Sequence, residues 1–368
     1  MENTQKNNLR IVIFAGGVGT RMWPLSRKAT PKQFEKIINN KSTLQLAVER
    51  VRPETELEDI YISTGKSYIQ TIKEQLPKLP NSNLIGEPEM RDVAPAVGYL
   101  MAILAKKDPW GPVAILWSDH LMDNVQTFKN ALQVGGDYLK ENRNSFVFLG
   151  QKARFANQNL GWIQHGEKKE SINGFDVHEF VSWHYRPEIE IAKKYFKSDD
   201  YTWNPGYFVV TPQFVLNQFK KLQPKMYEGL MKLQESYGTP EHTQLLDEIY
   251  PKFEKISFDD AIVTKTSPDQ AVVIPVDLGW SDVGTWEALK EALQENPEDN
   301  IEKGKVVTHE TKNSVIYNYT DKLVTSVGAE GMIVVVTNDV IMVAPQESIP
   351  DVKKMLKKFE GTDLEKFT

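Results

Sequence analysis

The sequence predicts an α/β protein whose mostly parallel sheet is flanked by helices and is followed by a small C-terminal β domain with a terminal helix. Two observations predict the sheet. Short apolar runs alternate with segments that carry apolar residues at helical spacing, and residues 113–117 form a continuous apolar run, as in a strand covered on both faces. The third observation is that short β-branched runs replace this alternation after residue 300.

The alternation defines the elements of the first part of the chain in order. Each predicted strand is short and apolar, and the segment after it has apolar side chains on one helical face. The predicted strands are residues 9–15, 59–63, 83–86, 113–117, 145–150 and 271–276. The predicted helices are residues 43–51, 66–76, 94–107, 125–141 and 286–293. The region 151–275 is less regular, with β-like runs at 161–165, 175–181 and 207–211.

A change of composition marks a domain boundary near residue 300. Residues 296–300, Asn-Pro-Glu-Asp-Asn, interrupt the pattern like a linker. We therefore expect one domain at 1–295 and a β domain with a terminal helix at 301–368. The expected elements of the second domain are strands at 306–307, 314–317, 323–327, 332–337 and 340–343, and a helix at 352–359.

Composition excludes several classes of protein. Of the 368 residues 40% are hydrophobic, which is enough for a large core and excludes general disorder. The net charge of −6 argues against a nucleic-acid partner bound through a broad basic face. The absence of cysteine excludes disulfides, thiolate metal sites and cysteine nucleophiles. Because no apolar run approaches the roughly 20 residues that span a bilayer, we expect no membrane partner and a cytoplasmic protein.

A glycine-rich loop follows the first predicted strand. Glycines at this place let backbone N–H groups approach a phosphate closely. The loop, residues 16–21, matches neither the dinucleotide fingerprint nor a Walker A loop. Arg21 on the loop and Lys32 beyond it are suited to neutralising a polyphosphate, although a tight turn with solvated cations is the alternative.

Two aspartates follow buried strands: Asp119 after 113–117, and Asp282 after 271–276. Ligands of open α/β sheets bind beyond the carboxyl ends of the strands. Two carboxylates there could hold one Mg²⁺, which prefers few carboxylates together with phosphate oxygens and water. Taken singly, an aspartate at such a place is more often a turn or helix-cap residue than a metal ligand. Glu87 could face the same crevice or belong to a turn.

These residues together resemble the signature of nucleotide-sugar pyrophosphorylases. The match begins with Ala-Gly-Gly-Val-Gly-Thr-Arg at 15–21, and Trp-Pro-Leu-Ser at 23–26 and Pro-Lys-Gln-Phe at 31–34 point to the mannose-1-phosphate guanylyltransferase branch. Further matches follow in the same order, including Glu-Pro at 87–88, Asp-His at 119–120 and Trp-Ser-Asp-Val-Gly at 280–284. The resemblance covers nearly the whole chain, including the C-terminal β region.

The resemblance implies a Rossmann-like nucleotidyltransferase domain that converts GTP and mannose 1-phosphate to GDP-mannose and pyrophosphate with Mg²⁺. It implies that Arg21 holds the leaving pyrophosphate, that Lys32 contacts the phosphates at the reacting centre, and that Asp119 and Asp282 hold the metal. Guanine presents N–H donors, so Glu87, Asp92 and the backbone carbonyls near Gly16 are the nearest candidates to accept them. The implied nucleotide-binding residues are Ala15, Gly16, Gly17, Gly19, Thr20, Arg21, Glu87, Arg91, Asp92 and Pro95.

The chain departs from the family pattern where the sugar phosphate should bind. The usual Phe-x-Glu-Lys-Pro becomes Phe-Val-Ser-Trp-His-Tyr-Arg-Pro at 180–187, in which Arg186 stands in the place of the lysine. Gly161, Arg186 and Asn204 are the implied sugar-phosphate residues. Another sugar-1-phosphate nucleotidylyltransferase, or a catalytically weak nucleotide-sensing regulatory subunit, therefore remains an alternative. The sequence also leaves open a homo-oligomer.

Overall fold

The computed structural model describes residues 9–17, 22–27, 31–38 and 40–368. Contacts divide the chain into two compact units. The first unit comprises residues 1–16, 48–117 and 122–280, and the second comprises 17–47, 118–121 and 281–368. Both units are therefore built from segments far apart in the sequence. The division at 1–295 and 301–368 stays a prediction from composition.

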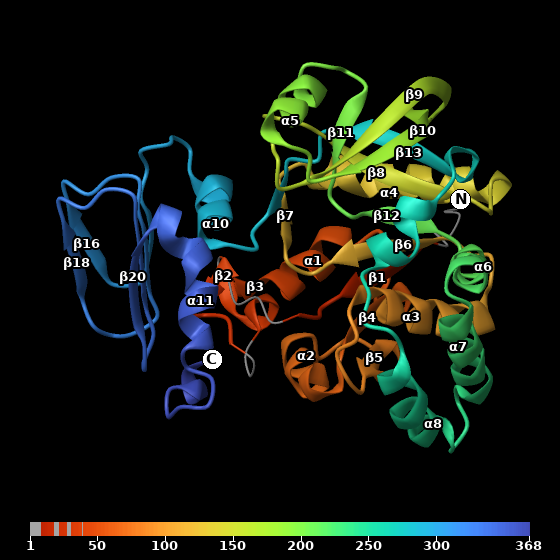
Figure 1. The fold of residues 1–368 in the computed structure, drawn as a ribbon, viewed down its shortest axis with the longest axis horizontal. Helices are drawn as coiled ribbons and strands as arrows, with labels where there is room; N and C mark the ends of the chain where they lie inside the picture. The colour runs from red at the N-terminus through yellow and green to blue at the C-terminus, as the bar shows by residue number, and fades with distance from the viewer. Residues whose placement is uncertain (1–8, 18–21, 28–30, 39) are drawn as a thin grey trace, which may run out of the picture. The chain divides into compact units, whose positions relative to one another are not determined.

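A ten-stranded sheet forms the centre of the first unit (Figure 1). Its strands run in the order β11-β9-β10-β13-β8-β12-β6-β1-β4-β5. Their bounds are β1 Arg10–Phe14, β4 Ile60–Gly65, β5 Leu84–Glu87, β6 Val113–Trp117, β8 Phe146–Lys152, β9 Gly161–Ile172, β10 Phe175–Tyr185, β11 Tyr201–Asn204, β12 Phe208–Val210 and β13 Ala271–Val276. The α/β fold is confirmed, and each strand predicted before residue 151 is present.

The sheet is more mixed than the sequence predicted. Parallel pairing joins β6, β1, β4 and β5 in succession, and also joins β13 to β8. Strand β12 enters between β6 and β8 antiparallel to both, and the hairpin β9–β10 is antiparallel throughout. The hairpin is longer than expected because its outer part, 167–171, is polar and exposed, which hid the strand pattern. Asn173 and Gly174, both at positive φ, form its turn.

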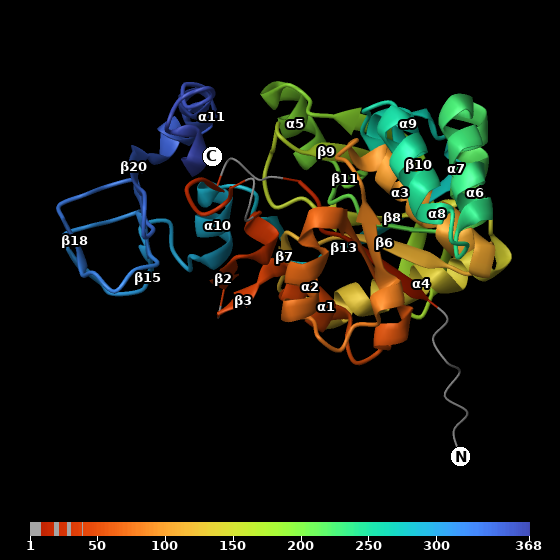
Figure 2. The same cartoon turned by 90° about the horizontal axis from the view of Figure 1, so that it is seen from below.

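Helices cover both faces of this sheet. Figure 2 shows α3, α6 and α7 on one side and α4 on the other, and Gly135 of α4 allows the backbone to approach Val209 and Val147. The predicted helices before residue 151 are present, although the one expected at 66–76 begins as a 3₁₀ turn. The bounds are α1 Thr43–Val51, α2 Ile69–Gln75, α3 Val93–Lys107, α4 Val125–Glu141, α5 Ile189–Phe196, α6 Pro212–Leu222, α7 Pro224–Ser236, α8 His242–Ile249 and α9 Phe258–Ala261.

Short strands of the second unit stack in successive turns. Strands β15, β17 and β19 pair in parallel, β20 closes this sheet antiparallel to β19, and β16 pairs in parallel with β18. The expected small β domain and terminal helix are therefore present. Their bounds are α10 Trp286–Leu293, β15 Ile301–Lys303, β16 Val306–His309, β17 Val315–Asn318, β18 Val324–Val327, β19 Met332–Val336, β20 Ile341–Pro345 and α11 Val352–Lys357.

The second unit also contains a segment from near the start of the chain. Met22, Trp23, Leu25 and Ile37 are buried in one hydrophobic core with residues of α10, β17, β19 and α11. The hairpin of β2 (Lys36–Ile38) and β3 (Lys41–Ser42) follows this segment. Two further short strands, β7 (His120–Met122) and β14 (Trp280–Asp282), pair with each other. The sequence did not predict these four strands, because each is only two or three residues long.

Among the described residues, no helix is both long and apolar enough to cross a bilayer.

Candidate functional site

An ion pair joins two of the predicted catalytic residues within the second unit. The ammonium Nζ of Lys32 lies 2.8 Å from the carboxylate Oδ2 of Asp119. Lys32 begins a 3₁₀ turn, Lys32–Phe34, and its side chain is 9% exposed, whereas that of Asp119 is 31% exposed. The backbone N–H of Lys32 donates to Ser26 Oγ at 3.0 Å, so the turn that precedes the lysine also positions it.

The charge of Asp119 is strongly favoured. Burial by itself would raise its pKa, but the Lys32 ammonium and the neighbouring His120 outweigh burial and hold the pKa well below its ordinary value. His120 Nε2 lies 3.8 Å from Asp119 Oδ1. Asp119 is therefore a carboxylate with an accessible edge, which is the state that a cation or a phosphate-bound metal requires.

Asp282 lies on strand β14, which pairs with strand β7. Asp119 directly precedes β7, and Asp282 is the last residue of β14, the partner of β7. Asp282 Oδ1 accepts from the backbone N–H of Gly284 at 2.8 Å, which orients the carboxylate within a turn. No group of three or more acidic or histidine side chains suited to a metal occurs in the described part of the chain. Two carboxylates fit Mg²⁺, which takes its remaining ligands from phosphate and water.

The glycine-rich loop is described at residues 16 and 17, which follow Ala15, the residue after β1. Ala15 is buried and tied to β4, because its N–H donates to Ser63 O at 2.8 Å and its carbonyl accepts from Thr64 Oγ1 at 2.7 Å. Gly16 and Gly17 are exposed, and Gly17 has a φ of +87°, which favours glycine. The predicted site residues Gly19, Thr20 and Arg21 lie outside the described residues.

Glu87 of the first unit is buried at the end of β5. Its Oε2 accepts from Tyr250 Oη at 2.6 Å, and its Oε1 accepts from Ser63 Oγ at 3.2 Å. Burial raises the pKa of this carboxyl, although both hydrogen bonds act in the opposite direction. The geometry makes Glu87 a side chain that joins β4, β5 and the turn at Tyr250, a role that the sequence did not suggest.

The other predicted nucleotide residues of the first unit lie around the start of α3. Asp92 has a φ of +68°, is exposed, and caps the helix by accepting from Val93 N at 2.8 Å. Arg91 pairs with Glu89 at 3.2 Å, while its Nε is buried and makes no hydrogen bond within the described residues. Pro95 is buried in the first turn of α3.

The predicted sugar-phosphate residues come together at one end of the sheet. Gly161, the first residue of β9, lies opposite Tyr185 of β10 and opposite Asn204 of β11. Arg186 follows Tyr185 directly, is exposed, and its guanidinium lies 5.1 Å from the centre of the Tyr185 ring. A Cβ on Gly161 would meet the Trp183 ring at 3.0 Å, so a larger residue would require the ring to shift by a few tenths of an ångström.

The segment that replaces the family pattern is internally hydrogen-bonded. His184 Nε2 lies 2.9 Å from Ser182 Oγ, and its Nδ1 lies 3.1 Å from Tyr195 Oη. Burial lowers the pKa of His184. His184 is therefore a structural side chain of the hairpin, whereas Tyr185 and Arg186 are exposed.

Asp259 lies in the turn of helix α9. The preceding residues contact the start of α3, because Ala94 N donates to Ile256 O at 3.1 Å. Burial, followed by the charges of Asp260 and Asp92, raises the pKa of Asp259 to about 6 from 3.8. A raised pKa means that the folded state binds the proton more tightly than the unfolded state does.

We expect the carboxyl of Asp259 to make stability depend on pH. The contribution of its raised pKa to the free energy of unfolding is fully present below about pH 4 and is lost as the pH rises through about 6. Relative to Asp259→Asn, the wild type should lose roughly 1 kcal/mol of stability between pH 5 and pH 8. Melting temperatures across this range measure the difference. Asp269→Asn, at a nearby exposed aspartate, is the control, and an equally large pH-dependent difference there would contradict the assignment.

Two family models together match most of the chain. The model of the nucleotidyl transferase family matches residues 10–299, and that of the mannose-phosphate isomerase/GMP-like β-helix domain matches residues 304–359. The mannose-1-phosphate guanylyltransferase ManC of Salmonella typhimurium is 31% identical over 368 residues, which are 97% of this chain and 74% of the relative. The mannose-1-phosphate guanylyltransferase of Escherichia coli K12 is 31% identical over 367 residues, with the same coverage.

Solved structures show the same fold. The crystal structure described as mannose-1-phosphate geranyltransferase from Thermus thermophilus matches with a TM-score of 0.84 and 25% identity, over 96% of this chain and 100% of that one. A Helicobacter pylori structure described as mannose-6-phosphate isomerase matches with a TM-score of 0.57 and 20% identity, over 74% of this chain and 99% of that one, which supports the fold alone. The chain belongs to the nucleotidyl transferase family and, within it, to the mannose-1-phosphate guanylyltransferases.

Proposed function

We propose that this enzyme transfers GMP from GTP to mannose 1-phosphate, giving GDP-mannose and pyrophosphate. The named activities of the relatives support the substrates. The observation that carries the proposal is the pair of Lys32 and Asp119, in which a largely buried ammonium holds an ionised carboxylate just beyond the end of strand β6. A cation and a carboxylate at this place suit phosphoryl chemistry, which needs positioning and neutralisation of charge more than a covalent group.

The reaction is an in-line displacement at the α-phosphorus of GTP. A phosphate oxygen of the sugar phosphate forms the new bond to this phosphorus, and the bond to the bridging oxygen of the β-phosphate breaks. The bonding electrons leave with pyrophosphate. Negative charge therefore develops on the transferred group and on the leaving group. We assign Lys32 to the transferred group, whose charge its ammonium would neutralise. Arg21 is assigned to pyrophosphate on the resemblance alone.

We assign Mg²⁺ to Asp119 and Asp282. The fit rests on the donor chemistry: two oriented carboxylates, one of them strongly biased towards its charged form, leave most of the coordination sphere to phosphate oxygens and water. The ion supplies Lewis-acid neutralisation of the phosphates when bound. Lys32 keeps Asp119 ionised and oriented by holding its Oδ2.

Asp92 is the better candidate to accept the N–H donors of guanine. Both oxygens of Glu87 already accept hydrogen bonds from Ser63 and Tyr250, and the side chain is nine-tenths buried. Asp92 is exposed at the start of α3. We therefore assign base recognition to Asp92, with Ala15, Gly16 and Gly17 as backbone contacts, while Glu87, Arg91 and Pro95 shape the surrounding structure.

Gly161, Asn204 and Arg186 are assigned to the sugar phosphate. Their support is their placement at one end of three adjacent strands, together with the exposure of Arg186. An exposed guanidinium can bind a phosphate through two parallel hydrogen bonds, so Arg186 could replace the lysine of the family pattern. A homo-oligomer and a cytoplasmic location stay predictions.

A substrate panel tests the activity directly. We expect pyrophosphate release to be fastest with GTP and mannose 1-phosphate when four nucleoside triphosphates are combined with several sugar 1-phosphates. A strong preference for another sugar or base would replace the proposed substrates. Release with no combination, despite binding of GTP, would favour the alternative of a nucleotide-sensing subunit.

The metal assignment predicts the behaviour of two variants. Asp119→Asn and Asp282→Asn should each lower kcat at least about 100-fold, because each removes a charged oxygen from the metal. Far-ultraviolet circular dichroism checks that the fold is retained. Asp123→Asn, which changes an exposed aspartate just after β7, is the matched control and should keep normal turnover. Normal turnover of either site variant at limiting Mg²⁺ would exclude a shared metal.

The sugar-phosphate assignment predicts a selective effect of Arg186. Arg186→Ala should raise the KM for mannose 1-phosphate at least about 10-fold, or about 1.4 kcal/mol, with little change in the KM for GTP. Lys168→Ala, near the other end of the same hairpin, is the control and should change neither constant. An unchanged KM for the sugar phosphate in Arg186→Ala would remove this residue from the site.

A further inference from the structure

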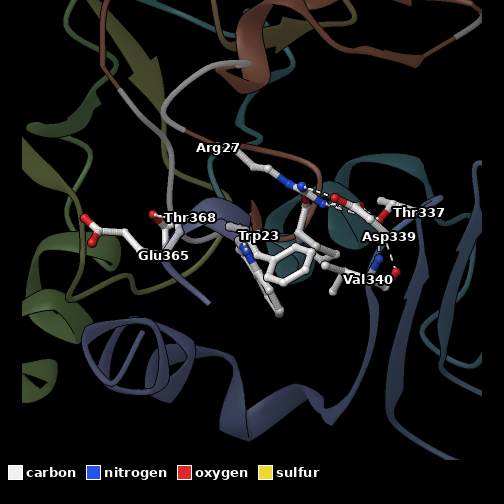
Figure 3. A network of polar contacts seen from close by, with 9 residues as sticks. Trp23, Arg27, Thr337, Asp339, Val340, Glu365 and Thr368 are labelled. Carbon is white, nitrogen blue, oxygen red and sulfur yellow. Dashed lines mark hydrogen bonds and ion pairs between the residues drawn. The ribbon is translucent and has the colours of Figure 1, made fainter. Parts of the chain in front are cut away.

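A forked ion pair links the segment before Lys32 to the C-terminal strands of the second unit. Arg27 Nη1 lies 2.6 Å from Asp339 Oδ2, and Arg27 Nη2 lies 2.6 Å from Asp339 Oδ1 (Figure 3). The two residues are 312 positions apart in the sequence. Arg27 also donates from Nε to the carbonyl of Pro24 at 2.9 Å. The guanidinium therefore ties its own turn to a distant loop through three good hydrogen bonds.

Asp339 is held in place by its own loop. It lies in the turn between β19 and β20, where Thr337 Oγ1 lies 3.0 Å from Asp339 Oδ1 and accepts from Val340 N at 3.1 Å. The hydrogen bonds from Arg27 are the main reason that the pKa of Asp339 falls to about 2. The turn thus presents a fixed, ionised carboxylate to Arg27. Solvated ion pairs contribute little to stability, but forked geometry on a rigid support fixes position.

The residue next to Arg27 in the chain is hydrogen-bonded to Lys32. Ser26, the neighbour of Arg27, is 1% exposed, and its Oγ accepts from the backbone N–H of Lys32 at 3.0 Å. The ammonium of Lys32 contacts Asp119 at 2.8 Å. A shift of the turn at 22–27 would therefore move the backbone of Lys32 relative to Asp119.

Separate contacts keep the same turn attached to the second unit. The Trp23 ring is buried, its Nε1 donates to the carbonyl of Phe367 at 2.8 Å, and its own carbonyl accepts from Trp286 Nε1 at 3.1 Å. These core contacts anchor the segment without Arg27. Loss of the ion pair should consequently alter the orientation of the turn more than the stability of the unit.

We propose that Arg27 and Asp339 are positioning residues for the transfer reaction, through which the β19–β20 turn of the C-terminal β region sets the place of Lys32. The proposal rests on the proposed function for its kinetic effect. Neither residue is assigned a contact with substrate. The C-terminal region thereby acts on the reaction from within its own unit. It holds the turn at 22–27, whose Ser26 accepts a hydrogen bond from the backbone of Lys32.

A double-mutant cycle tests the proposal kinetically. Arg27→Ala and Asp339→Ala should each lower kcat about 10-fold, with the KM for GTP within about 2-fold of wild type and the melting temperature within about 2 °C. The double variant should be no slower than either single variant. Asp339→Asn keeps the shape of the side chain but not its charge, so its kcat should lie between those of wild type and Asp339→Ala. Asp351→Ala, which breaks the exposed Asp351–Lys354 pair in the same region, should leave kcat unchanged.

A second measurement does not depend on activity. Lys32 should react slowly with a small amine-acylating reagent in the wild type, and severalfold faster in Arg27→Ala and Asp339→Ala, as measured by peptide mass spectrometry. Lys252, which is 70% exposed, is the internal reference and should react equally in all variants. Three results would overturn the proposal. They are unchanged labelling of Lys32, additive losses of kcat in the double variant, and a loss of kcat that parallels a loss of melting temperature. If the wild type releases no pyrophosphate, the proposed function fails, and the labelling still decides whether this pair positions Lys32.

Discussion

The burial of Trp23 is the interaction on which the second unit depends. Its ring packs in a core made by side chains of α10, β17, β19 and α11, and hydrogen bonds to Trp286 and Phe367 satisfy its carbonyl and its indole N–H. Because Trp23 lies between the glycine-rich loop and Lys32 in the sequence, its burial attaches the turn at 22–27 to a core built by the C-terminal residues. The C-terminal β region is therefore part of the structure that carries Lys32, and its removal would expose that core.

The surroundings of two carboxyl groups shift their pKa values in opposite directions. Asp119 is accessible along one edge, and the adjacent Lys32 holds its pKa far below the ordinary value. Glu87 is enclosed by Ser63 and Tyr250, and burial raises its pKa. The difference follows from the partner: a buried cation stabilises a carboxylate, whereas hydroxyl donors compensate only part of the cost of burial. This contrast is why we assign Asp119 to the metal and phosphates, and Glu87 to the architecture around the base.

The far end of the sheet is shaped by the hairpin β9–β10. Gly161 admits the ring of Trp183, and His184 is engaged by Ser182 and Tyr195, so the segment that departs from the family pattern is packed and hydrogen-bonded. Tyr185 and Arg186 are exposed beside the strand that ends at Asn204. The altered segment thus keeps one cation at the place where a sugar phosphate is expected, directly after the end of strand β10.

The sequence by itself determined the α/β class, the early strands and helices, the β character of the C-terminal region and the family. These features depend on local periodicity and on motifs whose residues are neighbours in the chain. It also singled out Lys32, as a cation beyond a glycine-rich loop, and Asp119 and Asp282, because residues after parallel strands share one edge of a sheet. It did not identify β12 as an antiparallel insertion, the full hairpin around Asn173, or the small strands β2, β3, β7 and β14, since pairing rather than composition defines them.

Only the tertiary structure decided which distant residues meet. The contacts of Arg27 with Asp339 and of Trp23 with Trp286 span more than 260 positions, and no local pattern records them. The structure likewise placed Glu87 against Tyr250 and Ser63, which donate hydrogen bonds to its two carboxylate oxygens. The physical reason is the same in each case. Local patterns report which face of an element is apolar, whereas a hydrogen bond or an ion pair between elements depends on how the chain packs as a whole.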